Sequence, residues 1–281
     1  MRYFKTALIL LICVPLSFAQ LPQPASITFT NLTGLGRVHG VNRTNMIVGH
    51  TVGGDNVQGF VLQNGAITDI LVPGSIQTLI FGVENNGRVV GAYYKSDHSG
   101  AHGFLYFNGN VTTIDFPGAN STMAHGINDP QRIVGEFRDN AGYSHGFLYD
   151  RGNFTRIDIS GAVNTYAEGI NNPGDVVGYF TDNSGHQHGF LYDKNGTITT
   201  IDVPFAGVTD TLLYGINSLG VIVGAYVDSA GTHGFLDVSG IFTGFDAPGT
   251  PPSVGTFAYG ISDNGQIAVF GATAFLGLLG S

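Results

Sequence analysis

The hexapeptide HGFLYD stands at residues 145–150 and returns unchanged at residues 188–193. Related copies are HGFLYF from residue 102 and HGFL from residue 233, with the degenerate copies QGFVL from residue 58 and TAFLG from residue 273. The six copies carry phenylalanines separated by 44, 43, 43, 45 and 40 residues, namely Phe60, Phe104, Phe147, Phe190, Phe235 and Phe275. A period of this length indicates an architecture that repeats one supersecondary unit.

Three further motifs keep the same period. A GIN-like motif begins at Gly40, Gly82, Gly126, Gly169, Gly215 and Gly260, and IVG, VVG or IAV follows each one. A run ending in Ile-Asp or Phe-Asp closes four units at Asp115, Asp158, Asp202 and Asp246, with DI at Asp69. All are rich in β-branched and aromatic residues and are bounded by Gly, Asn, Asp or Pro, which is typical of strands. Each unit therefore predicts four strands: GIN, IVG, HGFL and ID.

The connections between the HGFL and ID strands predict tight hairpins. They contain Asn108-Gly109, Arg151-Gly152, Asn195-Gly196 and Ser239-Gly240, and such pairs suit turns that need positive φ. Hence the two strands in each unit should pair antiparallel.

Four strands in a unit of about 43 residues predict a six-bladed β-propeller, an all-β fold with four-stranded blades. The last unit ends after its HGFL strand, and the missing strand is available at residues 26–31 (SITFTN). We expect this N-terminal strand to pair with the last blade near residues 273–278 and close the ring, which removes exposed sheet edges. An open β-solenoid fits less well because it has no need of such complementary ends.

The N-terminus has the pattern of a secretory signal peptide. Arg2 and Lys5 precede an apolar run at residues 6–18, and small residues precede a cleavage site after residue 19. We expect a signal peptide at 1–19, a short linker at 20–25 and a single propeller domain at 26–281. Cys13, the single cysteine, lies inside the signal, so the mature chain has no disulfide.

Charge and composition limit the partners. The chain has 11 Lys and Arg against 20 Asp and Glu, a net charge of −9, and only 11% charged residues. A surface so poor in cations is unsuited to nucleic acid, and no segment after residue 19 is long and apolar enough to span a membrane. We expect a secreted monomer, extracellular or periplasmic, that binds an unknown ligand or extracellular surface component.

The segment from HGFLYD through the ID run to AEGINNPGDVVGYF (residues 145–180) resembles the HAF-repeat family of secreted bacterial proteins. The unit of that family resembles HAFLW followed by AxxINxxGxVVG, and the resemblance covers essentially all of the mature chain. Gly replaces the middle Ala of the family in five of the six copies. The resemblance implies a β-propeller-like extracellular repeat and implies no reaction or catalytic residue.

Signatures of enzymes and metal sites are weak in this sequence. No serine has glycines at both −2 and +2, no cysteine nucleophile is available, and the chain has only three glutamates. Asp182, His186 and His188 could be imagined to hold zinc, but no spacing fixes them as a site. The Asp- and Asn-rich turns lack the alternating pattern of a calcium loop. We therefore expect no cofactor, with calcium as the weaker alternative.

The repeat histidines should oppose the aspartates of the ID strands. In an antiparallel hairpin, paired residue numbers have a constant sum, and opposed side chains share one face. The turns then predict four structural pairs: His102 with Asp115, His145 with Asp158, His188 with Asp202 and His233 with Asp246. A catalytic dyad is a weaker interpretation, since no nucleophile repeats beside them.

One position varies within an otherwise constant apolar frame. The residue just before the GIN glycine should lie near the start of the innermost strand, at one channel mouth; these residues are His39, Phe81, His125, Glu168, Tyr214 and Tyr259. Aromatic rings there suit stacking on sugars, with His and Glu as hydrogen-bonding groups, although the same side chains could merely plug the channel. Metal binding by His39, His125 and Glu168 is less consistent with their places in three different blades.

Two main function classes remain. The first is a non-enzymatic binding or interaction module. The sequence does not distinguish this class from a purely structural role in a cell-surface layer. The second is a hydrolase or lyase that uses His and Glu, or a bound metal, at the channel mouth, since fold alone does not decide chemistry.

Overall fold

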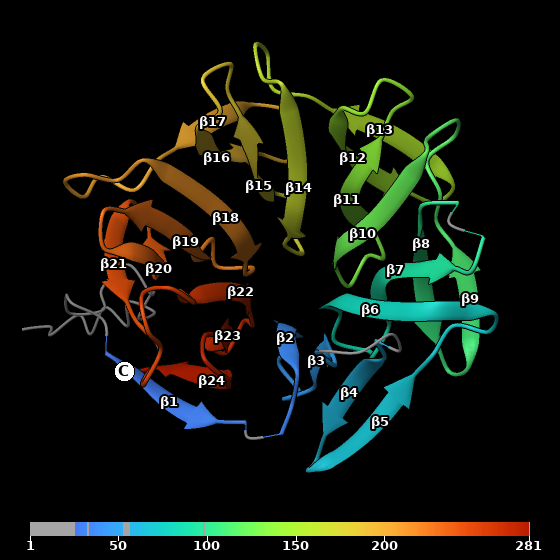
Figure 1. Ribbon diagram of the computed structural model, residues 1–281, viewed down its shortest axis with the longest axis horizontal. Coiled ribbons are helices and arrows are strands. Elements are labelled where there is room, and N and C mark those ends of the chain that lie inside the picture. The colour runs from blue at the N-terminus through green and yellow to red at the C-terminus, as the bar shows by residue number, and fades with distance from the viewer. Residues whose placement is uncertain (1–25, 33, 53–56, 98, 281) are drawn as a thin grey trace, which may run out of the picture.

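The computed structural model describes residues 26–32, 34–52, 57–97 and 99–280. Within these ranges the chain forms 24 strands, which pair as six separate four-stranded antiparallel sheets. The sheets are arranged around a central axis, and the chain passes from each sheet to its neighbour (Figure 1). The molecule is therefore a six-bladed β-propeller, as the repeat predicts.

The first three blades each follow the chain from the innermost strand outward. Blade one contains β2 to β5, at Arg37–Val41, Ile47–His50, Gly59–Gln63 and Ala66–Ile70. Blade two contains β6 to β9, at Ser75–Val83, Val89–Lys95, Ala101–Phe107 and Asn110–Thr113. Blade three contains β10 to β13, at Ser121–Ile127, Ile133–Arg138, Ser144–Asp150 and Asn153–Ile157.

Two more blades repeat this plan, and the sixth is assembled from both ends of the chain. Blade four contains β14 to β17, at Asn164–Ile170, Val176–Thr181, Gln187–Tyr192 and Ile198–Ile201. Blade five contains β18 to β21, at Asp210–Ile216, Ile222–Asp228, Gly231–Val238 and Ile241–Phe245. Blade six contains β22 to β24, at Phe257–Ile261, Gln266–Phe270 and Ala274–Leu279, and β1 at Ile27–Asn31.

The ring closes as predicted. β1 pairs antiparallel with β24, from Ile27 opposite Leu279 to Asn31 opposite Phe275. The N-terminal strand lies beside the last strand of the chain in Figure 1. Phe29 packs there against Phe245 and Phe275, with both pairs of ring centroids 5.9 Å apart.

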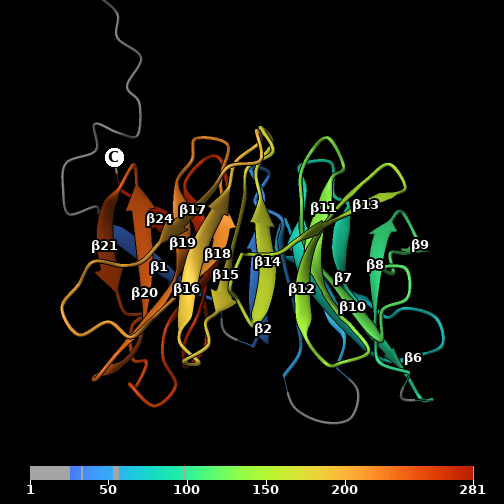
Figure 2. The same cartoon turned by 90° about the horizontal axis from the view of Figure 1, so that it is seen from above.

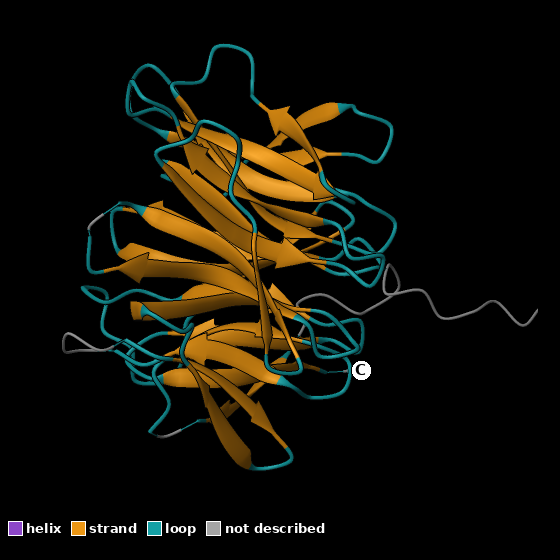
Figure 3. Cartoon of the chain, turned by 90° about the vertical axis from the view of Figure 1, so that its right-hand side faces the viewer, coloured by secondary structure: helices purple, strands orange, loops and turns teal. Residues whose placement is uncertain are grey.

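Loops gather on two opposite faces of the ring. Seen from the side, the sheets stand next to one another and the connections lie above and below them (Figure 2). Only strands and loops occur in the described part of the chain (Figure 3), so none of it contains a helix that could cross a membrane. The expected signal peptide and linker, residues 1–25, lie outside the described residues.

Packing between blades supplies the core. The HGFL phenylalanines of the first five blades are at most 2% exposed. Each of them packs with apolar side chains of the neighbouring blade; Phe147 of blade three, for example, shares a cluster with Val90 of blade two. A buried Phe stabilises by roughly 1.5–3 kcal/mol relative to an exposed one. These contacts therefore hold successive blades together.

Three of the four hairpin turns have the geometry that their sequences predict, whereas at Asn195-Gly196 only the glycine has a positive φ. Arg151 and Gly152 have φ of 50° and 90°, as both central residues of a type I′ turn require. The pairs at 108–109 and 239–240 show the same signs of φ. The ladder pairs Gly146 with Ile157, which is the predicted register.

A repeated threonine fixes the connection between blades. In five blades the residue four places before the GIN glycine is a buried threonine whose Oγ1 accepts a hydrogen bond from a backbone amide just after the outer strand. The five residues are Thr78, Thr122, Thr165, Thr211 and Thr256. This contact ties the end of one blade to the start of the next.

Candidate functional site

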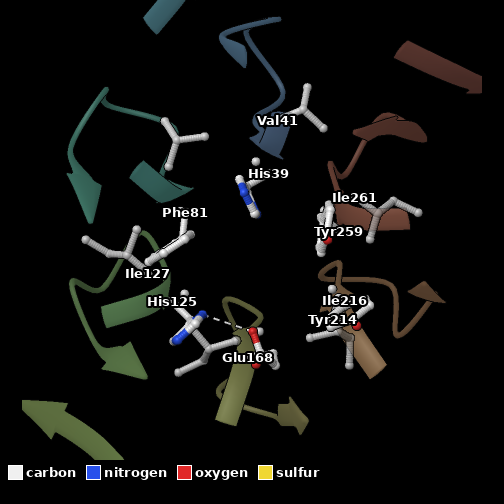
Figure 4. Close-up of a pocket in the computed structure, with 18 residues that line it drawn as sticks. His39, Val41, Phe81, His125, Ile127, Glu168, Tyr214, Ile216, Tyr259 and Ile261 are labelled. Atoms are coloured by element: carbon white, nitrogen blue, oxygen red, sulfur yellow. Dashed lines mark ion pairs between the residues drawn. The ribbon is translucent and has the colours of Figure 1, made fainter. Parts of the chain in front are cut away.

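The six variable residues are brought together around the central channel. Each comes from an innermost strand, and their side chains point toward a common centre (Figure 4). They do not lie at the strand starts, as expected from sequence, but inside the strands: Phe81 is the seventh residue of β6. The expected loop-proximal mouth is thus a constriction within the channel.

A bulge in each innermost strand explains this placement. In β10 the register skips from Ala124 to Gly126 and leaves His125 without a partner opposite it. The other five innermost strands skip at the equivalent residue. A bulged residue is re-aimed relative to its neighbours, and here the bulge turns one side chain per blade into the channel.

The GIN glycines are constant because successive innermost strands approach closely. A Cβ on Gly82 would lie 2.5 Å from the carbonyl oxygen of His125 in the next blade. A Cβ on any of the other five glycines would lie 2.6–3.0 Å from the carbonyl oxygen of the corresponding residue in the next blade. The last of these contacts, from Gly260 to His39, closes the circle. The glycine therefore serves the fold while the residue before it is free to vary.

The channel side chains contact one another around the ring. Phe81 and His125 stack with centroids 4.8 Å apart, and Tyr214 and Tyr259 lie 4.9 Å apart. His39 lies 5.1 Å from Phe81 and 4.5 Å from Tyr259. These contacts leave a cavity of about 90 Å³, which is small beside the roughly 300–1,000 Å³ of typical ligand pockets.

His125 and Glu168 form an ion pair in this channel, with Nδ1 and Oε2 3.0 Å apart. Burial opposes a charge on His125, but the charge and hydrogen bond of Glu168 outweigh it and raise the pKa of the imidazole. Nε2 of His125 is buried and has no hydrogen-bond partner in the structure. This residue of the channel lining therefore keeps one ring nitrogen without a partner.

The opposite side of the channel has a different electrostatic character. Burial, together with the charges of His50 and Arg37, lowers the pKa of His39 well below 6.5. Burial and Arg37 lower the pKa of His50 to about 4. The two imidazoles stack with centroids 4.9 Å apart, and Arg37 lies 4.7 Å above the ring of Phe270. His39 and His50 are therefore neutral near pH 7, and Nε2 of His39 and Nδ1 of His50 have no partner.

Sequence reasoning missed a second ring at the far end of the channel. The Asn of the GIN motif is buried and reaches the next blade: Asn128 Nδ2 donates to the carbonyl of Asn171 at 2.9 Å, and Asn171 donates to Asn217 at 3.3 Å. Asn42 and Asn217 make the same type of contact. The recurrence of Asn in the motif was the available signal, and its role is to join blades.

The four predicted histidine–aspartate pairs lie within hydrogen-bond distance. The Nδ1 atoms of the histidines lie 2.8, 2.9, 3.0 and 2.8 Å from their carboxylates, in the order His102–Asp115, His145–Asp158, His188–Asp202 and His233–Asp246. They lie in the blades, away from the residues that line the channel. A contact repeated in four blades is consistent with a structural role.

Three of these histidines also face a second carboxylate, and of the three carboxylates only Asp182 was considered together with its histidine from the sequence. Nε2 of His145 lies 3.3 Å from Asp139, that of His188 lies 3.6 Å from Asp182 and that of His233 lies 3.3 Å from Asp228. All three aspartates come from the Asp-rich turns. The sequence shows that each aspartate lies five or six residues before its histidine. Only the geometry of the turn decides whether the carboxylate points back to the imidazole ring.

The turns considered for calcium use their aspartates locally. Asp182 Oδ1 accepts hydrogen bonds from the amides of Ser184 and His186, and Asp139 Oδ1 does the same for two amides of its own turn. His186 lies 3.8 Å from Asp210 rather than joining His188. Within the described ranges, no three His, Cys, Asp or Glu side chains are grouped so as to hold a metal ion.

Comparison with known proteins places the fold but not the chemistry. No family model and no curated protein sequence matches the chain. A structure of the SapL1 lectin in complex with alpha methyl fucoside is similar, with a TM-score of 0.57, 13% identity, and coverage of 94% of this chain and 97% of the lectin. TolB from Acinetobacter baumannii gives 0.57 and 14%, covering 85% of this chain and 64% of TolB.

A third similar structure is virginiamycin B lyase from Staphylococcus aureus, with a TM-score of 0.50 and 15% identity, covering 92% of this chain and 99% of the lyase. One of them is named a lectin and another a lyase. At such identities the likeness defines the architecture alone. This chain is thus a six-bladed β-propeller whose function has to be argued from its own residues.

Proposed function

We propose that the protein is a secreted, non-enzymatic binding module that engages its ligand at the central channel. The observation that carries the proposal is the pair of buried, unpartnered nitrogens, Nε2 of His39 and Nε2 of His125, within a ring of aromatic side chains. A buried polar atom without a partner is costly, and a ligand group would satisfy it. The lectin among the similar structures supports a binding role on this architecture.

The small cavity limits what can enter. About 90 Å³ admits a hydroxyl or another terminal group, while the bulk of the ligand stays outside the constriction. His39, which is neutral near pH 7, and His125, whose pKa is raised, each offer one polar nitrogen, and Tyr214 and Tyr259 offer flat apolar surface. A glycan end or an extracellular polymer end has this combination of polar tip and apolar faces.

A ligand screen with a channel variant tests this proposal. The secreted protein is screened against glycans and polyesters with and without a chelator, and the hits are repeated with Tyr214→Ala/Glu168→Ala. We expect at least a tenfold loss of affinity, because both a ring face and the partner of His125 are removed. Unchanged affinity in that variant would place the site elsewhere, and loss of binding with chelator alone would indicate a metal.

Export is part of the proposal and rests on the N-terminal pattern at residues 1–19 and on the resemblance to the HAF-repeat family. N-terminal sequencing of protein recovered outside the cytoplasm should begin at Gln20. Recovery of an uncleaved chain in the cytoplasm would contradict the proposal that the protein is exported.

A channel hydrolase or lyase is the second candidate, favoured by the pair of His125 and Glu168. Glu168 fixes the orientation of the imidazole through Nδ1 and leaves Nε2 without a partner, an arrangement that suits a general base once Nε2 is deprotonated. Turnover of chromogenic esters or glycosides that His125→Ala abolishes would replace the binding proposal with this one.

A further inference from the structure

A larger cavity lies between the second and third blades. Its volume is about 530 Å³, within the range of small-molecule sites. Its lining includes Tyr94 from β7, Ser99 from the following turn, Ser121 and Met123 from β10, and Glu136 and Arg138 from β11. None of these residues lines the channel cavity.

The cavity lies beside a pair of positions whose residues differ from blade to blade. Met123 and Glu136 stand opposite each other on β10 and β11. In the next blade the same places are taken by Tyr166 and Tyr179, whose rings stack with centroids 4.6 Å apart. Two large rings fill the space there, whereas a thioether and a carboxyl leave it open here. A position that the repeat does not hold constant is free to serve a ligand rather than the blade.

The polar groups of this cavity are not satisfied by the protein. Oε2 of Glu136 is buried and accepts no hydrogen bond. Arg138 is exposed and makes no ion pair within the described part of the chain. Burial, with the nearby charge of Glu168, raises the pKa of Glu136, against the opposing charges of His125 and Arg138. The protein thus holds a desolvated acceptor and a free guanidinium at one opening.

We propose that this interblade cavity is a carbohydrate site that accepts one neutral pyranose ring, separate from the channel. A ligand hydroxyl donates to Oε2 of Glu136, and the guanidinium of Arg138 donates to a ligand oxygen. Tyr94 and Met123 provide apolar surface for the C–H face of the sugar. A neutral ligand fits best because Glu136 and Arg138 carry opposite charges, so that an ionic ligand meets one like charge.

The test uses the purified chain and methyl glycosides of galactose, glucose, mannose, fucose and N-acetylglucosamine, titrated by calorimetry and by chemical-shift perturbation. We expect saturable binding of at least one glycoside. Glu136→Gln should weaken it at least tenfold, because a site that hydrogen-bonds a hydroxyl discriminates strongly. Met123→Tyr/Glu136→Tyr should abolish it, since this variant rebuilds the tyrosine pair of the next blade. Asp150→Asn, on the outer side of blade three, is the matched control.

Each outcome decides between the two sites. The interblade site is supported if both cavity variants lose affinity for the glycoside while Tyr214→Ala/Glu168→Ala retains it. This result would hold even if the channel proposal failed. The inference is overturned if no glycoside binds at millimolar concentration. It is equally overturned if affinity survives Glu136→Gln and disappears in the channel variant. If the tyrosine variant does not fold, two other measurements decide. These are the affinity of Glu136→Gln for the glycoside and whether the glycoside shifts the resonances of residues around Tyr94 and Ser121.

Discussion

The histidine at the start of the HGFL motif shows how one residue serves a blade. In blade four, His188 lies between Asp202, 3.0 Å from Nδ1, and Asp182, 3.6 Å from Nε2. Burial opposes its charge, but the hydrogen bonds and charges of the two aspartates raise the pKa above 6.5. Asp182 in turn accepts amides of its own turn, and its pKa is lowered although partial desolvation acts the other way.

These shifts predict a definite pH dependence. Because the folded pKa of His188 is raised, its contribution to stability is complete below about pH 6.5 and is lost as pH rises through the folded value. A titration followed by NMR should give an imidazole pKa above 6.5, and Asp202→Asn should lower it. A value at or below 6.5 in the wild type would contradict the assignment.

Removing the imidazole of His188 should weaken the dependence of the free energy of unfolding on pH. In His188→Gln, the free energy of unfolding should fall less between pH 6 and 8 than in the wild type, because one raised histidine pKa no longer contributes. Chemical denaturation at several pH values measures this. A steeper decline in the variant would show that the sign is wrong.

Arg151 carries local strain that can be removed. Its φ of 50° lies in the left-handed region, where Asn is tolerated better than Arg. Arg151→Asn should stabilise the protein by about 0.5 kcal/mol, measured as a rise in the denaturation midpoint. Asn108→Ala, in the equivalent turn of blade two, should shift the midpoint the opposite way.

At the scale of the element, the innermost strand combines a constant glycine with a bulged, variable neighbour. The glycine lets adjacent innermost strands approach, and the bulge turns the neighbour into the channel. Sequence comparison of the six units found both positions, since the glycine is constant and the residue before it varies among four residue types. It did not find the bulge, because a bulge is a property of pairing between two strands.

The close approach predicts a costly substitution. Gly82→Ala would place a Cβ 2.5 Å from the carbonyl oxygen of His125, and the backbone of the next blade at Gly126 and a methyl of Val90 limit relaxation. We expect destabilisation of about 1–3 kcal/mol or more, as for other overpacked sites. Thermal denaturation measures it, with the exposed substitution Thr112→Ala as control. Equal midpoints for the two variants would mean that the ring of glycines is not under this constraint.

At the scale of the whole molecule, the two ends of the chain complete one blade. β1 covers the outer edge of β24, so the ladder between Ile27 and Leu279 is the seam of the ring. Stability of the whole propeller therefore depends on a strand that is far from its partner in sequence, and closure leaves the sixth blade with the same four strands as the others.

Deletion of residues 20–31 should open this seam. The unpaired edge of β24 offers free backbone groups to other chains, so we expect aggregation. Light scattering and size-exclusion chromatography measure it, with removal of residues 20–25 alone as the control. A truncated protein that stays monomeric with an unchanged melting temperature would show that β1 is dispensable.

The sequence by itself determined the number of blades, the order of their strands, the ring closure and the register of the hairpins around Asn108 and Arg151. These properties follow from alternation, turn length and repetition, which are all local along the chain. Only the tertiary structure decided that His125 meets Glu168, that Asn128 reaches Asn171, and that Glu136 faces an open cavity. Such contacts depend on which surfaces of neighbouring blades meet and how closely, and spacing along the chain does not encode that distance.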